Sequence, residues 1–190
     1  MNTWSPDVYA KAWYFATIAH EGQTYGGRTE GERINYLNHI GSVAMEVIHA
    51  IQQTPTTLQA DLAIQCALLH DVIEDTAFGY DDIVQQFGTA VADGVLALTK
   101  DKRLPSKTDQ MLDSLRRIQE QPYEVWIVKM ADRITNLSHP PYYWDGKKIV
   151  SYQEEAELIL QELRDGNALI AARLRDKIMN YTSFAKPPQR

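Results

Sequence analysis

The stretch ALLHDVIEDT, residues 67–76, decides how this sequence is interpreted. An apolar run typical of a buried helix suddenly carries one imidazole and three carboxylates. With about 3.6 residues per turn, His70 is predicted to lie above Glu74, and Asp71 above Asp75. Three carboxylates at the C-terminal end of a helix oppose the helix dipole, and a bound cation would offset that cost. His-Asp alone is weak evidence, but the Glu-Asp pair that follows makes it specific.

Two further stretches carry chemically active side chains. VWIVKMADRITNL, residues 125–137, is another apolar helical pattern, and it places Asp132 one turn before Asn136 on the same face. YLNH, residues 36–39, ends in His39 just before a helical pattern. Taken alone, Asp132 reads as an ordinary surface carboxylate and His39 as a capping or surface histidine.

Together these stretches supply two imidazoles and two carboxylates. That combination suits a borderline divalent ion such as Mn²⁺, Fe²⁺ or Zn²⁺, and it leaves positions open for water and substrate. A bound ion of this kind lowers the pKa of water and polarises a phosphoryl oxygen. The candidate ligands are His39, His70, Asp71 and Asp132.

Helical periodicity runs through most of the 190 residues, and we find no internal repeat and no strand-rich block. Ser5-Pro6 is typical of a helix start, and the Gly-rich range 22–36 is predicted to be a loop. The chain is therefore expected to be all-α, a single-domain bundle over residues 1–190. Helices are predicted over 6–21, from about 39 to 53, and over 58–73, 81–87, 91–99, 108–120, 122–137 and 149–181, with Gly166 as a break in the last.

The composition narrows the setting and the partners. Apolar residues make up 44% and charged residues 23%, as in ordinary soluble globular proteins. A net charge of -6 argues against a nucleic-acid partner, because phosphate backbones attract a basic excess. Cys66 is the single cysteine, which fits a reducing, cytoplasmic setting. The N-terminus lacks a signal-peptide pattern, and no stretch has the apolar length of a membrane span.

The motifs ALLHDVIEDT, VKMADRITNL, YLNH and AHEGQ (residues 19–23) resemble the hydrolase domain of the RelA/SpoT homologues, in the same order, over about residues 8–160. The similarity is to the small, hydrolase-only type that includes the metazoan SpoT-like hydrolases. The resemblance implies an HD-type helical bundle that removes the 3′-pyrophosphate from guanosine tetra- and pentaphosphate, (p)ppGpp. It also implies a small nucleotide as partner, and the sequence gives no indication of oligomeric state.

The resemblance assigns a role to each candidate residue. Glu74 and Asp75 would orient or deprotonate the attacking water. Asn136 would contact the ribose and phosphate region, Lys102 a phosphate, and Tyr152 the guanine. A solvated loop lysine and a core aromatic remain open as alternatives for Lys102 and Tyr152. One Mn²⁺ ion would be held by His39, His70, Asp71 and Asp132.

The sequence departs from the family pattern in the range 24–40. Where the family has a basic pair after H-x-G-Q, this chain has Thr24-Tyr25-Gly26, and the loop to His39 is longer. Arg28 or Arg33 is expected to supply the missing charge from another position. The Pro expected after His39 is Ile40.

Two alternatives to this function stay open. The chain could act as an HD-type phosphohydrolase on another nucleotide or a phosphorylated metabolite, because the altered loop bears on base recognition. It could instead be a non-catalytic, metal-binding regulatory module, but metal binding alone would not require both Glu74 and Asp75. Of the remaining histidines, His20 is interpreted as structural, and His49 and His139 as surface or capping residues.

Overall fold

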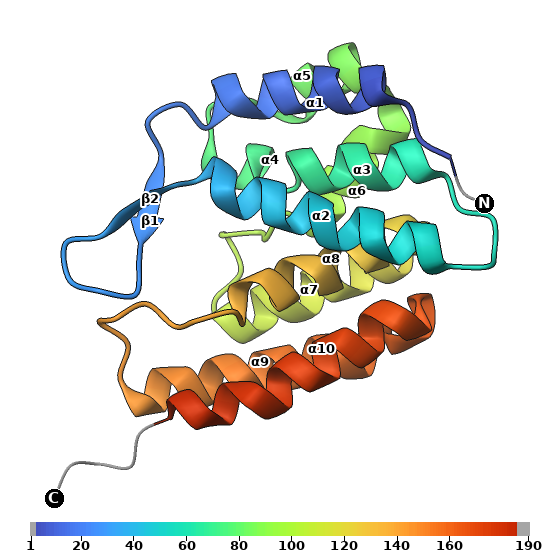
Figure 1. The fold of residues 1–190 in the computed structure, drawn as a ribbon. Helices are drawn as coiled ribbons and strands as arrows, with labels where there is room; N and C mark the ends of the chain where they lie inside the picture. The colour runs from blue at the N-terminus through green and yellow to red at the C-terminus, as the bar shows by residue number, and fades with distance from the viewer. Residues whose placement is uncertain (1–2, 186–190) are drawn as a thin grey trace, which may run out of the picture.

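The helices predicted from the sequence form and stack in layers in the computed structural model, which describes residues 3–185. α1 packs on α3, α2 packs on both α3 and α8, and α9 and α10 lie against the far side of α8 (Figure 1). The all-α prediction is confirmed. The helices are α1 Pro6–Ala19, α2 Leu37–Gln53, α3 Ala60–Leu69, α4 Val72–Asp75, α5 Tyr80–Phe87, α6 Thr89–Leu98, α7 Lys107–Gln119, α8 Tyr123–Asn136, α9 Gly146–Leu163 and α10 Ala168–Tyr181, with short 3-10 turns at Arg164–Gly166 and Thr182–Phe184.

Helix starts follow ordinary capping chemistry. The Ser5 hydroxyl accepts a hydrogen bond from the Val8 backbone N–H at 3.4 Å, and Pro6 occupies the first turn of α1, as predicted. Asp145 caps α9, and Asn167 caps α10. The predicted break at Gly166 is confirmed, because the 3-10 turn that ends there separates α9 from α10.

The core lies where α2, α3 and α8 meet. Ile40 of α2, Leu68 of α3 and Ile127 of α8 are fully buried there. Burying each such side chain contributes roughly 1.5–3 kcal/mol. Since the three helices share this core, the polar residues at their ends are held at fixed separations.

The predicted helix over 58–73 is wrong at its C-terminal end. α3 ends at Leu69, and His70 and Asp71 form a turn that leads into the single turn of α4. Asp71 has φ −101° and ψ −1°, away from ideal helical values, although the Asp75 N–H still bonds to the Asp71 carbonyl at 2.9 Å. The polar stripe expected on one helix is therefore divided between a turn and a short helix.

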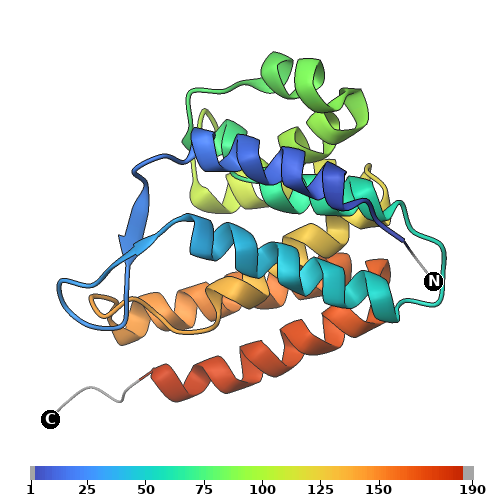
Figure 2. The same ribbon diagram turned by 45° about the horizontal axis from the view of Figure 1, so that its top comes forward.

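The range 22–36, predicted as a loop, contains an antiparallel hairpin. Its strands are β1 Thr24–Gly26 and β2 Arg33–Asn35, with Tyr25 opposite Ile34. Strands this short give no readable alternation in the sequence. The hairpin projects from the helices toward the segment between α8 and α9 (Figures 1 and 2), and the Tyr142 N–H donates to the Gly27 carbonyl at 3.3 Å.

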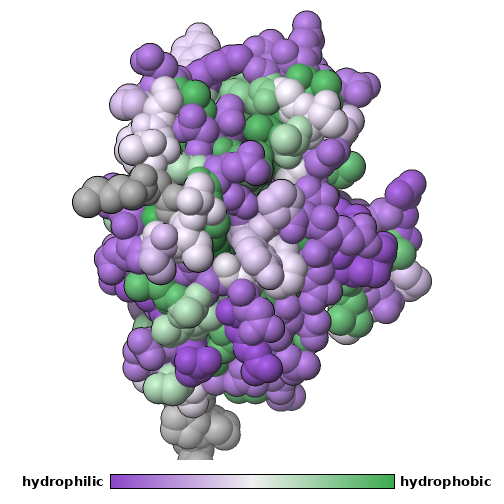
Figure 3. Space-filling model, turned by 90° about the vertical axis from the view of Figure 1, so that its right-hand side faces the viewer, coloured by the Kyte–Doolittle hydropathy of each residue, from purple (hydrophilic) through white to green (hydrophobic). Residues whose placement is uncertain are grey.

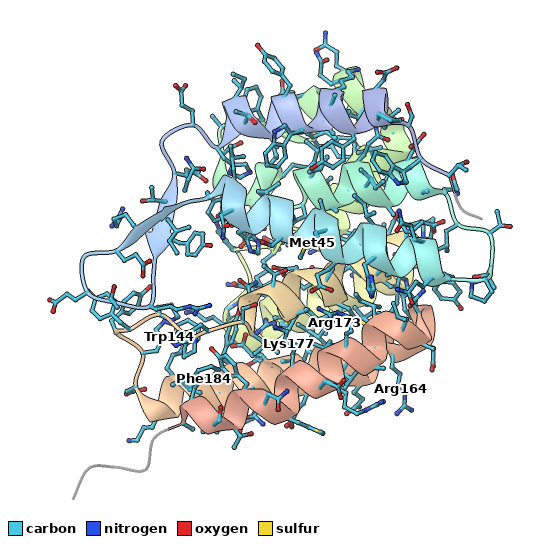
Figure 4. All side chains as sticks on the ribbon, viewed as in Figure 1. Met45, Trp144, Arg164, Arg173, Lys177 and Phe184 are labelled. Atoms are coloured by element: carbon cyan, nitrogen blue, oxygen red, sulfur yellow. The ribbon has the colours of Figure 1, made fainter. Side chains whose placement is uncertain are left out.

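The side turned away from the hairpin is mainly hydrophilic, with scattered hydrophobic side chains (Figure 3). Arg173 of α10, labelled in Figure 4, binds Glu46 of α2 through both carboxylate oxygens and so fixes α10 to the core. Within residues 3–185, no helix combines the length and apolar character needed to cross a membrane. Residues 186–190 lie outside the described range.

Candidate metal centre

The structure brings the four predicted ligands together from three parts of the chain. His39 comes from the first turn of α2, His70 and Asp71 from the turn after α3, and Asp132 from α8. His39 Nε2 lies 3.2 Å from His70 Nε2. Asp71 Oδ2 is 3.0 Å from His70 Nε2 and 3.6 Å from His39 Nε2. Asp132 Oδ1 is 3.5 Å from His39 Nε2 and 3.9 Å from His70 Nε2.

This donor set fits a divalent ion. Ligand atoms about 2.1 Å from one ion lie roughly 3.0–3.4 Å from each other. The ligand atoms of His39, His70 and Asp132 all lie within 4.8 Å of one another, and Asp71, which is not part of that group, approaches the two imidazoles to 3.0 and 3.6 Å. The His70 Nδ1–H donates to the Ala67 carbonyl at 2.8 Å, so the neutral ring turns its Nε2 lone pair toward the cluster. Two buried imidazole nitrogens 3.2 Å apart require a proton or a cation between them.

The electrostatics of the cluster favour a positive charge. Burial disfavours the imidazolium form of His70, but the adjacent carboxylates of Asp71 and Asp132 outweigh burial and raise the pKa of His70 to about 9. Although burial opposes ionisation, the two imidazoles hold the pKa of Asp71 well below its usual range. The Lys129 ammonium and the imidazoles likewise lower the pKa of Asp132. In the metal-free protein a proton on His70 supplies the charge that a metal ion would otherwise supply.

We therefore expect divalent-metal affinity to rise with pH. Because the pKa of His70 is about 9 in the metal-free protein, an ion must displace one proton at any lower pH. The apparent association constant for Mn²⁺ should rise about tenfold per pH unit up to that pKa and then level off. Calorimetric titration with Mn²⁺ at several pH values, in buffers of different ionisation enthalpy, measures both the affinity and the proton released. Equal affinity at about pH 6 and pH 8 would contradict this electrostatic account.

Neighbouring side chains hold the carboxylates in place. The Tyr36 hydroxyl donates to Asp71 Oδ2 at 2.5 Å, and the Asn136 amide donates to Asp132 Oδ1 at 2.6 Å. Lys129 Nζ lies 3.3 Å from Asp132 Oδ2. Groups that hydrogen-bond to metal ligands fix their orientation and tune their strength as donors. The motif YLNH contains Tyr36, but its contact with Asp71 spans 35 residues and is not visible in the sequence.

The two predicted catalytic carboxylates lie on α4, beside the ligands. Glu74 Oε2 accepts a hydrogen bond from the Lys100 backbone N–H at 3.0 Å. Burial, together with the charges of Asp71 and Glu74, raises the pKa of Asp75. A carboxylate with a raised pKa is a better proton acceptor, which suits the role predicted for Asp75.

A cavity of about 530 Å³ opens on these residues, a size typical of small-molecule sites. Of the predicted substrate-binding residues, Arg28, Asn136 and Tyr152 line it. Lys102 does not: its Nζ donates to the Glu74 carbonyl at 2.9 Å, and the residue lines a separate cavity. Arg33, the second candidate for the missing charge, hydrogen-bonds to Thr24 within the hairpin and is not among the lining residues.

Aromatic residues that the sequence did not single out also line this cavity. They are Tyr25 of β1 and the run Tyr143-Trp144 between α8 and α9; Trp144 is labelled in Figure 4. The ring centroids of Tyr152 and Trp144 are 4.9 Å apart, and the Arg133 guanidinium lies 4.0 Å from the centroid of the Tyr152 ring. Tyr152 thus lines the cavity and is also packed as a core aromatic.

The remaining histidines lie outside the ligand cluster. His20 is buried, its Nδ1 lies 2.7 Å from Gln23 Oε1, and its ring packs on Tyr36, which fits the predicted structural role. His49 is exposed. His139 differs from the prediction of a surface or capping residue, because it lines the cavity and packs 4.8 Å from Phe184.

Comparison with known proteins gives consistent matches. A family model described as an HD domain matches residues 12–163. The guanosine-3′,5′-bis(diphosphate) 3′-pyrophosphohydrolase MESH1 of Danio rerio is 30% identical over 179 residues, which are 92% of this chain and 94% of that protein. The bifunctional (p)ppGpp synthase/hydrolase SpoT of Escherichia coli K12 is 36% identical over 72% of this chain and 19% of its own length. A solved structure, described as a metazoan ortholog of SpoT that hydrolyzes ppGpp, superimposes with a TM-score of 0.78 at 24% identity, covering 94% of this chain and 97% of its own.

Proposed function

Because this chain belongs to the HD-domain family, and matches MESH1 over almost its whole length, we propose that it is a metal-dependent (p)ppGpp 3′-pyrophosphohydrolase. The products are GDP or GTP and pyrophosphate. The observation that carries the proposal is the position of Glu74 and Asp75 beside the His39, His70, Asp71 and Asp132 cluster, at the wall of one cavity. A metal-binding module without catalysis would need no such carboxylate pair.

The four cluster residues would hold one divalent ion, for which we propose Mn²⁺. Fe²⁺ and Zn²⁺ accept the same imidazole and carboxylate donors and are the alternatives. When bound, such an ion polarises a phosphoryl oxygen and lowers the pKa of water. Tyr36 and Asn136 would keep the carboxylates of Asp71 and Asp132 aimed at the ion through their hydrogen bonds.

The protein's own residues would handle the proton and the substrate. Glu74 and Asp75 would orient a water molecule and accept its proton while its oxygen attacks the phosphorus attached to O3′. The bond between that phosphorus and O3′ breaks, and the proton passes to O3′. Asn136 would contact the ribose and phosphate region, Tyr152 the base, and Arg28 a phosphate, all three from the cavity wall. Lys102, which lies outside this cavity, would contribute positive charge toward a phosphate from beside Asp75, whose Oδ1 is 3.7 Å from its Nζ.

The proposal also covers the domain organisation, the partner and the cellular setting. We propose one domain over residues 1–190, a small nucleotide as the partner, and a cytoplasmic setting. The match of the HD-domain model to residues 12–163 supports the first.

Purified protein supplied with Mn²⁺ should release pyrophosphate from ppGpp and leave GDP, as measured by anion-exchange chromatography. Protein treated with a chelator is the control and should be inactive until Mn²⁺ is restored. A panel with other nucleotides and phosphorylated metabolites tests the second candidate, which keeps the chemistry and changes the substrate. The run Thr24-Tyr25-Gly26, where the resemblance leads us to expect a basic pair, favours that candidate, because Tyr25 lines the cavity. Turnover of another nucleotide without turnover of ppGpp would rule out the first substrate.

A further inference from the structure

Helix α8 places two cations, Lys129 and Arg133, in the wall of the cavity, and the proposed mechanism gives neither of them a contact with the substrate. Lys129 is 6% exposed and Arg133 is 3% exposed, and both line the cavity. Lysine and arginine are almost never buried this deeply unless they are paired, since an unpaired buried charge is destabilising. Each of these two side chains is therefore expected to have a negatively charged or hydrogen-bonding partner.

Lys129 is only partly satisfied by the protein. An ammonium group has three donors. Among residues 3–185, the one hydrogen bond or ion pair of the Lys129 side chain is with Asp132 Oδ2 at 3.3 Å, which is at the long end of hydrogen-bond distances. Donors remain for a ligand in the cavity that Lys129 lines.

The guanidinium of Arg133 packs over the ring of Tyr152, 4.0 Å from its centroid, and makes only long hydrogen bonds. Its two terminal nitrogens donate to the Tyr152 carbonyl at 3.3 Å and to Glu155 at 3.4 Å, both long contacts. Its Nε is buried without a hydrogen-bond partner in the described chain. By comparison, Arg173 donates two hydrogen bonds to the Glu46 carboxylate, one of them 2.7 Å long, and so has a close partner within the protein. Arg133 thus places positive charge at the cavity wall, partly offset by the Glu155 carboxylate at 3.4 Å.

We propose that Lys129, reinforced by the charge of Arg133, binds the phosphate group that the metal centre holds. Phosphate suits the position because its oxygens are hydrogen-bond acceptors that can take up several donors at once. The position of Asp132 shows where this phosphate would lie. Its Oδ1 is 3.5 Å from His39 Nε2, on the metal side, and its Oδ2 faces Lys129. One carboxylate therefore separates the ammonium from the metal position. The choice of this phosphate rests on the proposed function, whereas anion binding by Lys129 does not.

Charge balance supports a cation at this position. Asp71, Glu74, Asp75 and Asp132 surround the reacting end of the cavity, and the substrate adds further negative charge. The hairpin supplies little compensation, because Arg28 is exposed and Arg33 does not line the cavity. Lys129 and Arg133 of α8 provide the compensating positive charge at the cavity wall.

The direct test is binding of inorganic pyrophosphate in the presence of Mn²⁺, measured by calorimetry on the full chain. Lys129→Met should weaken binding about tenfold to a hundredfold, the usual effect of losing a charge-assisted hydrogen bond. Lys129→Arg should retain most of the affinity. Lys107→Met is the control: Lys107 is exposed at the start of α7 and lines neither cavity, so the change should alter affinity by less than about threefold.

Mn²⁺ stoichiometry and thermal unfolding show whether Lys129→Met keeps its metal centre and its fold. Pyrophosphate affinity equal to wild type in a folded, metal-loaded Lys129→Met would overturn the proposal, as would equal losses in Lys129→Met and Lys107→Met. If Lys129→Met fails to fold, NMR of wild-type protein with labelled lysine ammonium groups decides. The Lys129 signal, identified by its absence from Lys129→Arg, should shift on addition of pyrophosphate, and a fixed signal would refute the contact. Because these measurements need no turnover, failure to hydrolyse ppGpp leaves them interpretable.

Discussion

Asp71→Asn should abolish divalent-metal binding and turnover together. Asp71 Oδ2 lies 3.0 Å from His70 Nε2 and 3.6 Å from His39 Nε2, so it faces both imidazoles. The amide keeps the shape of the side chain but removes the negative charge that attracts an ion. We expect the loss of Mn²⁺ affinity to exceed the roughly 10- to 100-fold effect typical of changes to residues that only support a ligand. Metal analysis after dialysis and pyrophosphate release from ppGpp measure the two losses.

Asp101→Asn is the matched control for that change. Asp101 is also a carboxylate with a depressed pKa, about 2, but hydrogen bonds from Arg103 cause the shift. Asp101 belongs to the loop between α6 and α7 and takes no part in the ligand cluster. Its substitution should leave Mn²⁺ stoichiometry and turnover close to wild type. Wild-type metal affinity in Asp71→Asn would remove Asp71 from the ligand set.

Glu74→Gln should separate catalysis from metal binding. Glutamine can still accept the hydrogen bond that the Lys100 N–H donates to Glu74 Oε2 at 3.0 Å, so the junction between α4 and the loop after α6 should be preserved. It cannot accept a proton from water. We expect the rate of turnover to fall about 10²- to 10⁴-fold, the usual contribution of a general base, with Mn²⁺ affinity unchanged. Single-turnover pyrophosphate release and calorimetry measure the two quantities.

Asp75→Asn, measured in parallel, shows which of the two carboxylates accepts the proton from water. Because burial and the charges of Asp71 and Glu74 raise the pKa of Asp75, that group gains a proton at a higher pH than an ordinary aspartate does. If Asp75 is the proton acceptor, activity should decline as the pH falls through this raised pKa, and Asp75→Asn should remove that limb of the pH–rate profile. Unchanged turnover in Glu74→Gln would show that Glu74 has no catalytic role.

The helical architecture was predictable because its signals are local. Apolar residues that recur at helical spacing, Ser5-Pro6 at the first helix start and the break at Gly166 each depend on near neighbours in the chain. The turn at His70 was predicted as helix, since Asp71 departs from helical geometry while its neighbours keep a helical pattern. The hairpin was missed because three-residue strands have no period to detect.

The candidate ligands were predictable from residue type and motif order. Imidazoles and carboxylates that interrupt apolar helices point to a cation whatever the detailed geometry. The structure then brought the side chains of His39, His70 and Asp132 to a few ångströms of one another. Their role as ligands remains a prediction for the metal-binding experiments to test.

The sequence by itself determined the fold class and the kind of chemistry, because helical periodicity and residue type are both properties of short segments. Only the tertiary structure decided which residues support the site. The Tyr36–Asp71 hydrogen bond joins residues 35 positions apart, and the burial of Lys129 depends on the helices packed around α8. The structure also places Lys102 outside the cavity, and it places the hairpin in contact with the segment after α8. Contacts between distant segments depend on how whole helices pack, and that information is spread over the entire core rather than contained in any one motif.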